Sequence, residues 1–404
     1  MVNRLHFRWF KSIEDVEFEP GRVNVLIGAN GSGKSNLLEA LGVLSAAVSG
    51  RVDDEALLRR GVRPGVPKLY KCAFPNIKGP LHIYFGAWHD SASYEVSLFN
   101  PIKDPSPAWR FHTESLKKDN VTLIGRSHRA AVKLNPEAGL VALKMVEMSD
   151  QDDVIKMLNE LRDYAIFTPN TPTLRGIAPD TQPRQPIGLS GGQLANGVLD
   201  ILKQRPLLRI GHPLNDSEAF FSKVTQDVLR LIDWAKSYGT AQASSMPLSS
   251  SVGSTERVIR FTDRYMKSGR DTLSGYDASE GALYVLFHAV LAAHPRSPQI
   301  CAVDNADHGL NPRLSQALFG KICEWYLKSP YPRQIFLTTQ NPLSLDGLPL
   351  QEDQVRLFTV SRTEKGRTVV KRIVLDKKLK KMAEDGWSLS RLWVMGHLGG
   401  VANV

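Results

Sequence analysis

The sequence contains little cysteine and no long hydrophobic run. Its 404 residues include 3 cysteines, Cys72, Cys301 and Cys323, which lie far apart without any CxxC spacing. Three isolated cysteines indicate neither a zinc site nor a disulfide framework, and they are typical of a protein in a reducing compartment. There is no run of about 18 or more apolar residues, and the N-terminus MVNRLHFRWFKS lacks an apolar signal segment. We therefore predict a cytoplasmic protein without membrane segments.

The charge is moderate and positive. A hydrophobic content of 42% with 23% charged residues is typical of a globular protein and disfavours disorder. The 51 lysines and arginines exceed the 41 aspartates and glutamates, which gives a formal net charge of +10. This excess favours a polyanionic partner such as DNA, but it is spread over the chain and does not select that partner.

The N-terminal residues predict a phosphate-binding unit. Residues 3 to 27 contain three short strands, LHFRWF, VEFE and VNVLI, separated by turn residues. The third strand runs into a glycine-rich segment and then into a helix that begins near Gly33. A strand, a glycine loop and a helix in this order form the unit that binds phosphates.

The rest of the chain predicts two further kinds of structure. Residues 68 to 135 contain β-rich pieces, LHIYFGAW, YEVSLF and VTLIG, which predict an antiparallel sheet. The C-terminal third alternates helix and strand, which predicts a parallel sheet. The predicted elements are helices at 149–164, 217–238, 281–293 and 313–327, strands at 299–304 and 334–339, and a mobile serine-rich loop at 239–255.

The glycine-rich segment, GANGSGKS at 28–35, matches the pattern GxxxxGK[ST] in its expected place between strand and helix. Glycines let backbone N–H groups wrap phosphates without interference from Cβ atoms. Lys34 is predicted to reach the β- and γ-phosphates of ATP, and the Ser35 hydroxyl to ligate Mg²⁺. A glycine turn with a chance lysine is the alternative, which the agreement of every fixed position disfavours. The predicted contacts to the nucleotide are Gly28, Asn30, Gly31, Ser32, Gly33, Lys34, Ser35 and Asn36.

A second half of this site is predicted at the end of an apolar strand. Residues 299–304, QICAVD, have the form of a Walker B segment, whose aspartate, Asp304, is predicted to bind the metal ion or its water. A buried strand capped by an aspartate is the alternative, and the phosphate-binding loop upstream disfavours it.

Four segments resemble the SMC/RecF-type ABC ATPases of the compact AAA-type group, which occurs in bacterial anti-phage systems and in the N-terminal half of OLD-family nucleases. They are FRWFKSIEDVEFEPGRVNVLIGANGSGKSNLLEAL, SEGALYVL, VDNADHGLNP and LTTQNPLSLDGL. The resemblance covers roughly residues 1–50 and 270–400. It implies an α/β ABC-type head with a parallel core sheet, an antiparallel β subdomain and a compact helical insertion.

The resemblance also implies an organisation. We expect an N-terminal lobe at 1–145, the helical insertion at 146–270 and a C-terminal lobe at 271–404. Neither predicted helix of the insertion continues into long heptads, which excludes a long coiled-coil arm. In this family two heads dimerise head to tail, and each ATP lies between one P-loop and the signature motif of the partner.

Two segments compete for the signature motif. A literal LSGGQ occupies 189–193, 111 residues before Asp304, whereas Gly281 lies 23 residues before it. Because the signature of ABC ATPases opens the helix that leads into the Walker B strand, Ser279, Glu280 and Gly281 are predicted to contact the γ-phosphate in trans. LSGGQ is then the start of a helix in the insertion, and it remains the alternative.

Departures from the family pattern predict slow hydrolysis. Asn305 stands where relatives have the glutamate that polarises the attacking water, and an amide cannot accept that proton. Asp307 is a substitute carboxylate, although it matches a more C-terminal acidic position. Gln340 replaces the switch histidine. Residues 309–312, GLNP, resemble the D-loop, and Lys11 and Ser12 match a position that contacts nucleotide in relatives.

The resemblance predicts an ATPase that assembles around ATP and Mg²⁺ and acts as a sensor or scaffold in anti-phage defence. Its effector, of the nuclease type, would be a separate protein, because only about 60 residues follow TTQNP and a Toprim nuclease domain needs more. The alternative is a RecF-like, ATP-dependent DNA clamp that acts in repair. A metabolic kinase is disfavoured because no acceptor-binding residues are evident.

Overall fold

The protein is described by a computed structural model that covers residues 1–75, 77, 79–127, 135–145, 152–204, 215–249 and 256–400. At its centre is a six-stranded sheet with the order β15-β14-β3-β13-β12-β8. Neighbouring strands from β14 to β8 run parallel, and β15 is antiparallel to β14. The strands are β3 (Val23–Ile27), β8 (Ala165–Phe167), β12 (Ile300–Val303), β13 (Gln334–Thr338), β14 (Val355–Arg362) and β15 (Thr368–Ile373). The predicted parallel core sheet is confirmed.

A second six-stranded sheet, with the order β2-β1-β4-β5-β6-β7, is antiparallel throughout. Its strands are β1 (Arg4–Phe10), β2 (Ile13–Phe18), β4 (His82–His89), β5 (Ala92–Phe99), β6 (Arg110–Lys118) and β7 (Val121–Arg126). The predicted antiparallel subdomain is thus confirmed, but β6 was not predicted. In β6 the buried position 114 holds a glutamate and not an apolar residue, which breaks the alternation by which strands are recognised. The Glu114 carboxylate can be buried because it accepts hydrogen bonds from Tyr94 and from the backbone of Leu140 and Val141.

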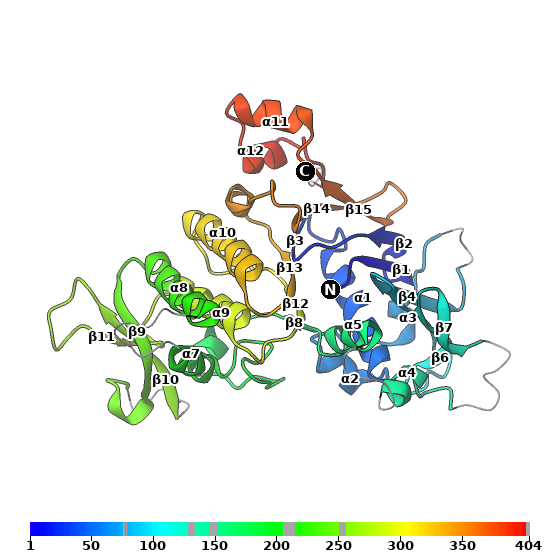
Figure 1. The fold of residues 1–404 in the computed structure, drawn as a ribbon, viewed down its shortest axis with the longest axis horizontal. Coiled ribbons are helices and arrows are strands. Elements are labelled where there is room, and N and C mark those ends of the chain that lie inside the picture. Colours follow the sequence, from blue (N-terminus) through cyan, green and yellow to red (C-terminus); the bar gives the residue numbers. More distant parts are fainter. Residues whose placement is uncertain are drawn as a thin grey trace.

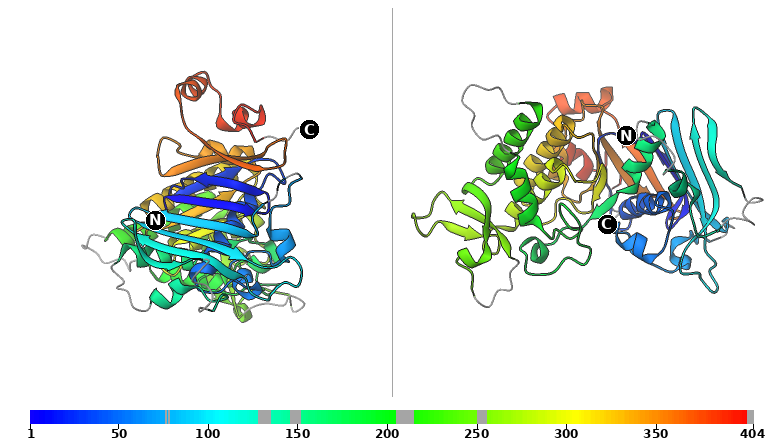
Figure 2. Two further views of the ribbon diagram at one scale, coloured as in Figure 1. Left: turned by 90° about the vertical axis from the view of Figure 1, so that its right-hand side faces the viewer. Right: turned by 60° about the horizontal axis from the view of Figure 1, so that its bottom comes forward.

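Helices cover both faces of the parallel sheet (Figure 1). Helices α1 and α5 lie on one face, between the two large sheets, and α9 and α10 lie on the other (Figures 1 and 2). The α-helices are α1 (Lys34–Val48), α2 (Asp54–Leu58), α3 (Pro67–Tyr70), α4 (Leu140–Lys144), α5 (Asp153–Arg162), α6 (Thr171–Leu174), α7 (Leu194–Lys203), α8 (Asp216–Leu231), α9 (Glu280–Ala293), α10 (Pro312–Lys328), α11 (Lys377–Glu384) and α12 (Leu389–Val394). The described residues also form the 3₁₀ turns η3 (Ala243–Ser245) and η4 (Pro342–Gly347).

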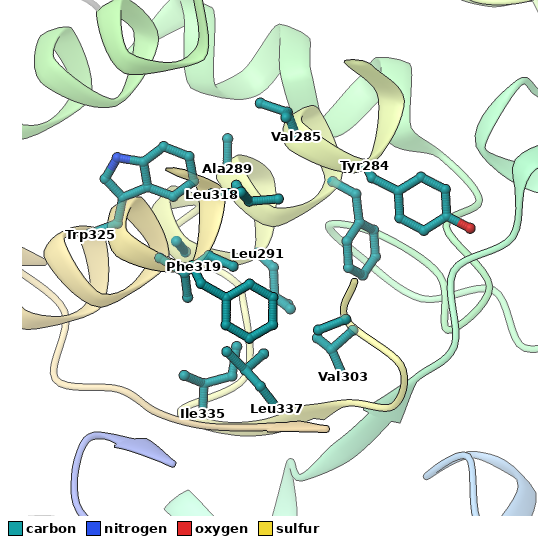
Figure 3. Close-up of a cluster of buried hydrophobic side chains, with 14 of the residues drawn as sticks. Tyr284, Val285, Ala289, Leu291, Val303, Leu318, Phe319, Trp325, Ile335 and Leu337 are labelled. Carbon is teal, nitrogen blue, oxygen red and sulfur yellow. The ribbon is translucent and has the colours of Figure 1, made fainter. Parts of the chain in front are cut away.

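The strands of the parallel sheet contribute alternate side chains to two hydrophobic cores. In β13, Ile335 and Leu337 pack with α9 and α10, whereas Phe336 packs with α1 and the antiparallel sheet. Figure 3 shows the first core, where Leu337 meets Phe319 of α10 and side chains of α9. Residues 282–293 of α9 are all buried, which explains the apolar run that predicted this helix. The sheet is therefore held from both faces.

The insertion contains more β-structure than the sequence indicated. Strands β9 (Ala235–Gln242), β10 (Arg257–Asp263) and β11 (Thr272–Ser274) form an antiparallel sheet in the order β11-β10-β9. The predicted helix at 217–238 was too long, because α8 ends at Leu231 and the chain enters β9 at Ala235. Ala235 is buried in β9. Because an apolar residue suits a buried helix as well as a buried strand, this residue does not mark where the helix ends. The predicted loop at 239–255 is likewise wrong for 239–242, and its residues 250–255 lie outside the described part.

The helix predicted at 149–164 forms as α5, with Val154, Leu158 and Leu161 buried as expected. Its N-cap is Asp152, whose carboxylate accepts a hydrogen bond from the Val154 N–H; Ser149 lies outside the described residues. Within the described part of the chain, no helix is long and apolar enough to cross a membrane.

The sheet gives a direct test of the packing. Leu337 is fully buried in the central strand β13. We expect Leu337→Ala to lower the free energy of unfolding by about 2–5 kcal/mol, because it removes apolar contacts on one face and leaves a cavity. Denaturant unfolding measures this loss. Leu81→Ala, at a side chain that is 70% exposed, is the matched control and should change the free energy by less than about 0.5 kcal/mol. Equal losses in the two variants would contradict the assigned core.

Candidate nucleotide site at the carboxyl edge of the parallel sheet

The glycine loop lies between β3 and α1 and is supported from behind by β14 and β15. Gly28 has φ 153° and Gly33 has φ 112°. A Cβ atom on Gly28 would lie 2.0 Å from the Val360 carbonyl oxygen, and one on Gly33 would lie 2.3 Å from Thr368 Oγ1. Both the backbone conformation and the close approach of the neighbouring strands therefore require glycine at these positions.

Two further contacts support the loop, and neither was predicted from the sequence. Arg362 of β14 donates from Nε to the Gly31 carbonyl at 2.9 Å. The Ala29 N–H donates to the Gly400 carbonyl at 2.8 Å, which brings the segment after α12 onto the loop. Both partners come from parts of the chain more than 300 residues away in sequence, and no local pattern marks them.

Lys34 folds back over the loop. Its residue is 7% exposed, and Nζ donates to the carbonyl oxygens of Gly28 at 2.6 Å and Ala29 at 3.1 Å. Burial lowers the pKa of Lys34, whereas the charges of Asp304 and Asp307 raise it. The ammonium thus lies within the electrostatic reach of both carboxylates and is bonded only to neutral acceptors, which suits a group that binds an anion.

Asp304 follows β12 and joins three elements. Its Oδ2 accepts from the Ser35 hydroxyl at 2.8 Å, and its Oδ1 accepts from the Thr338 hydroxyl at 2.5 Å. Its N–H donates to the Phe167 carbonyl at the end of β8, at 2.9 Å. The two residues predicted to bind metal, Ser35 and Asp304, are therefore in direct contact. Thr338 was missed, although it lies in the quoted segment LTTQNP.

A hydroxyl and a carboxylate in contact are hard oxygen ligands of the kind that Mg²⁺ prefers. Within the described residues, no group of three or more His, Cys, Asp or Glu side chains could hold a metal ion. The donor set fits an ion that takes its other ligands from water and phosphate, as Mg²⁺ does in nucleotide sites, and does not form an all-protein cage.

The predicted catalytic residues lie together beside Asp304. Gln340 Nε2 donates to Asn305 Oδ1 at 3.2 Å, and the Asn305 N–H donates to the Thr338 hydroxyl at 2.7 Å. Asp307 Oδ2 accepts from the N–H groups of Gln340 at 3.2 Å and Asn341 at 2.8 Å. Asp307 thus holds the backbone of Gln340 and Asn341 in place.

A cationic wall lies on the other side of the loop. Ser12 Oγ accepts from Asn36 Nδ2 at 2.7 Å, and Glu39 pairs with both Lys11 and Arg63. Burial lowers the pKa of Lys11, and the adjacent Glu39 opposes this effect. These cations border a cavity of about 560 Å³, which is a suitable size for a small-molecule ligand. Arg63 was not identified in the sequence.

The three predicted signature residues begin α9. Ser279 is the exposed N-cap residue, and its side chain makes no capping hydrogen bond. The Glu280 carboxylate accepts from the Thr171 hydroxyl and packs against Gly309 of the predicted D-loop. A Cβ atom on Gly281 would lie 2.9 Å from Leu314. The predicted signature and D-loop are therefore neighbours, and within the described residues no hydrogen bond or ion pair connects the signature to 28–35 of the same chain.

The LSGGQ segment has a different environment. The Asp180 carboxylate accepts from the N–H groups of Ser190 at 3.0 Å and Gly192 at 2.9 Å. A Cβ atom on Gly188 would lie 2.2 Å from the same carboxylate. Successive N–H groups of this kind form an anion-binding nest, and here the nest already holds an anion from its own chain. The geometry thus disfavours LSGGQ as the segment that contacts a partner's phosphate.

Comparisons of sequence match only part of the chain, whereas a comparison of structure matches nearly all of it. Residues 23–143 match a family model described as "AAA domain, putative AbiEii toxin, Type IV TA system". The chain is 46% identical over 65 residues to the DNA replication and repair protein RecF of Magnetococcus marinus, and 49% identical over 53 residues to RecF of Leifsonia xyli. These alignments span 16% and 13% of this chain and only 17% and 14% of the RecF chains.

A structural likeness extends over nearly the whole chain. The crystal structure of an SMC head bound to the C-terminal winged-helix domain of ScpA aligns with a TM-score of 0.51 and 14% identity. The alignment covers 93% of this chain and 99% of the SMC head. At this identity the likeness concerns the fold alone. The chain therefore resembles an SMC head in its fold, and its N-terminal segment is similar to RecF and to the matched AAA-domain model.

Proposed function

We propose that this protein binds ATP with Mg²⁺ at residues 28–36 and Asp304 and assembles head to tail around the nucleotide. The observation that carries the proposal is the direct contact of Ser35 with Asp304 beside the buried ammonium of Lys34. Lys34 would exchange its bonds to the Gly28 and Ala29 carbonyls for phosphate oxygens. Mg²⁺ held by Ser35 and Asp304 would neutralise phosphate charge.

The second half of the site would come from a partner copy. Ser279 is exposed at the N-terminus of the 14-residue helix α9, and its hydroxyl makes no capping bond. A helix N-terminus and a free hydroxyl are donors for a phosphate oxygen. The neighbouring Glu280 and Gly309 fix the direction of this helix start through their mutual packing, which supports Ser279, Glu280 and Gly281 as the signature that acts in trans.

The residues around Asp304 favour slow hydrolysis. The Asn305 amide accepts a hydrogen bond from Gln340 and cannot take a proton from water. One oxygen of Asp307 is occupied by two backbone N–H groups, which leaves it poorly placed as a replacement base. The site would therefore hold ATP for long periods, and we infer that the assembled form is the active state.

A protein of this kind is best suited to act as a cytoplasmic sensor or scaffold. We propose that its assembly recruits a separate effector of the nuclease type, in anti-phage defence. The description of the matched family model, which names a putative toxin of a type IV toxin–antitoxin system, supports a function with a second component. RecF similarity and the net charge of +10 favour the second candidate, an ATP-dependent DNA clamp.

Assembly tests the site in trans. We expect the solution molar mass to double with ATP in the wild type but not in Ser279→Arg, because the larger cation blocks the helix start from the partner's nucleotide. Light scattering coupled to size exclusion measures the mass. Ser190→Arg in LSGGQ is the matched control and should still assemble. Loss of assembly in Ser190→Arg alone would transfer the signature to LSGGQ, and no nucleotide dependence in any variant would refute head-to-tail assembly.

Turnover tests the role of Asn305. We expect steady-state hydrolysis by the wild type to fall well below the common range of about 1–10³ s⁻¹. Asn305→Glu should raise kcat at least tenfold, because a general base contributes roughly 10²–10⁴-fold when well placed. Asn305→Ala controls for loss of the amide and should give no increase. Wild-type turnover within the common range would contradict the proposal.

DNA binding distinguishes the two candidate functions. A clamp should bind labelled duplex DNA more tightly with ATP than without it, and its affinity should fall steeply as salt rises. A protein-sensing scaffold should show weak binding that does not depend on ATP. Fluorescence anisotropy over a range of salt concentrations measures both, and Lys34→Ala, which should not hold ATP, is the control.

A further inference from the structure

Five arginines surround a cavity far from the nucleotide site. Its volume is about 590 Å³, within the usual range of small-molecule sites. The arginines come from the α1–α2 region, from the junction of α5 and β8, and from the loop before LSGGQ. They are Arg51, Arg59, Arg60, Arg162 and Arg184. Ser49, just after α1, also lines the cavity, and the 15-residue α1 separates it from the glycine loop by about 22 Å.

Three of the arginines are paired with carboxylates at the rim. Asp53 accepts from Arg51 at 2.5 Å, Glu55 pairs with Arg59, and Asp163 lies 3.0 Å from Arg184. The side chains of Arg51 and Arg59 are 58% and 68% exposed. Exposed ion pairs of this kind contribute about 0–1 kcal/mol and are readily exchanged. They therefore do not prevent an incoming anion from binding.

The remaining two arginines have no carboxylate partner. Arg60 is buried, and its donors reach only neutral oxygens: the hydroxyls of Ser45 and Ser49 at 2.6 Å each and the carbonyls of Ala56 at 2.8 Å and Arg162 at 3.1 Å. Burial, together with the charge of Arg184, lowers the pKa of Arg60 to about 10, although the charge of Asp163 opposes this effect. A buried cation without a counter-ion is unfavourable, and the neutral bonds hold its charge in the wall of the cavity.

Arg162 supplies the second uncompensated charge. It ends α5, is exposed, and has no side-chain hydrogen bond or ion pair among the described residues. A solvated arginine in the last turn of a helix would explain Arg162 alone. It would not explain why Arg162 lines the same cavity as a buried arginine that lacks a carboxylate. Two positive charges are thus available to one ligand.

We propose that this cavity binds a phosphorylated small molecule that carries at least two negative charges. Guanidinium groups bind phosphate oxygens with two parallel hydrogen bonds, and the exposed Arg162 is free to turn toward such a ligand beside the buried Arg60. The cations gather around one concave site, whereas a nucleic-acid backbone requires an extended path. The cavity is separate from residues 28–36 and lies within one chain, so the proposed ligand can bind it without a dimer.

The cavity also joins two parts of the molecule. Arg60 Nη2 donates to the Arg162 carbonyl, and the Ile166 N–H of β8 donates to the Arg60 carbonyl at 2.8 Å. Arg184 lies over the ring of Phe167 at 5.9 Å, beside the end of β8 that contacts Asp304. A ligand here would contact the residue that follows α1, the α5–β8 junction and the loop before LSGGQ at once, so we expect its binding to change the affinity for ATP.

Pyrophosphate is a suitable probe, because its two phosphoryl groups match the two uncompensated arginines. Calorimetric titration of the full-length Lys34→Ala variant, in which the glycine loop is weakened, should still show one binding site. Adding Arg162→Glu should weaken this binding roughly tenfold or more, because a charge-assisted bond becomes a repulsion. Arg110→Glu, at an exposed residue of β6, is the matched control and should leave binding unchanged.

The possible results are separable. Binding that is lost with Lys34→Ala but unaffected by Arg162→Glu would assign all pyrophosphate to the nucleotide site and overturn the proposal. Binding of a single-stranded oligonucleotide that depends on Arg162, without binding of pyrophosphate, would replace the small molecule by nucleic acid. Unchanged unfolding midpoints would exclude misfolding of the variants. Failure of ATP-driven assembly would not affect this result, because the titration does not require a dimer.

Discussion

The carboxylate of Asp304 is the contact on which the geometry of the candidate site depends. It accepts from Ser35 at the start of α1 and from Thr338 at the end of β13, and its backbone N–H reaches the end of β8. Ser35 and Asp304 are 269 residues apart in sequence, so this contact forms only when β12 and α1 are brought together by the parallel sheet. The spacing of the two predicted metal ligands is therefore a property of the sheet, and the two hydrophobic cores that hold the sheet from both faces also hold these two residues.

Helix α1 extends this dependence beyond the sheet. It begins at the glycine loop and ends at the arginine cavity, and 13 of its residues are buried. Tyr164 fixes it from the other side, because its hydroxyl donates to the Leu38 carbonyl at 3.0 Å. A helix packed on all sides moves as a unit, since its side chains interlock with their neighbours. Displacement at Ser49 would then reach Lys34, which gives the two proposed anion sites a physical route for coupling.

The sequence was sufficient where a signal is local. The glycine loop, the buried strand β12 and the apolar helix α9 each carry a pattern within a few residues, and all three elements form at the expected places. It was insufficient where distant residues decide the structure. The Asp180 carboxylate, nine residues before LSGGQ, accepts hydrogen bonds from the backbone of that segment. Strand β6 contains the buried Glu114, which is hydrogen-bonded to β5 and to α4. Arg60 and Arg162 are 102 residues apart, and no pattern in either segment indicates that they share a cavity.

The pairing of Asn305 with Gln340 bears on how such a protein would be regulated. In relatives with a glutamate and a histidine at these positions, the pair would titrate near neutral pH, because histidine has an ordinary pKa of about 6.5. Two amides do not titrate, and here they hydrogen-bond each other directly at 3.2 Å. The amide pair itself therefore does not change its charge with pH and supplies no proton acceptor. If ATP holds two copies together at this site, the lifetime of the assembly is set by dissociation of the nucleotide and not by its hydrolysis. A ligand that shifts α1 would then control assembly through nucleotide affinity.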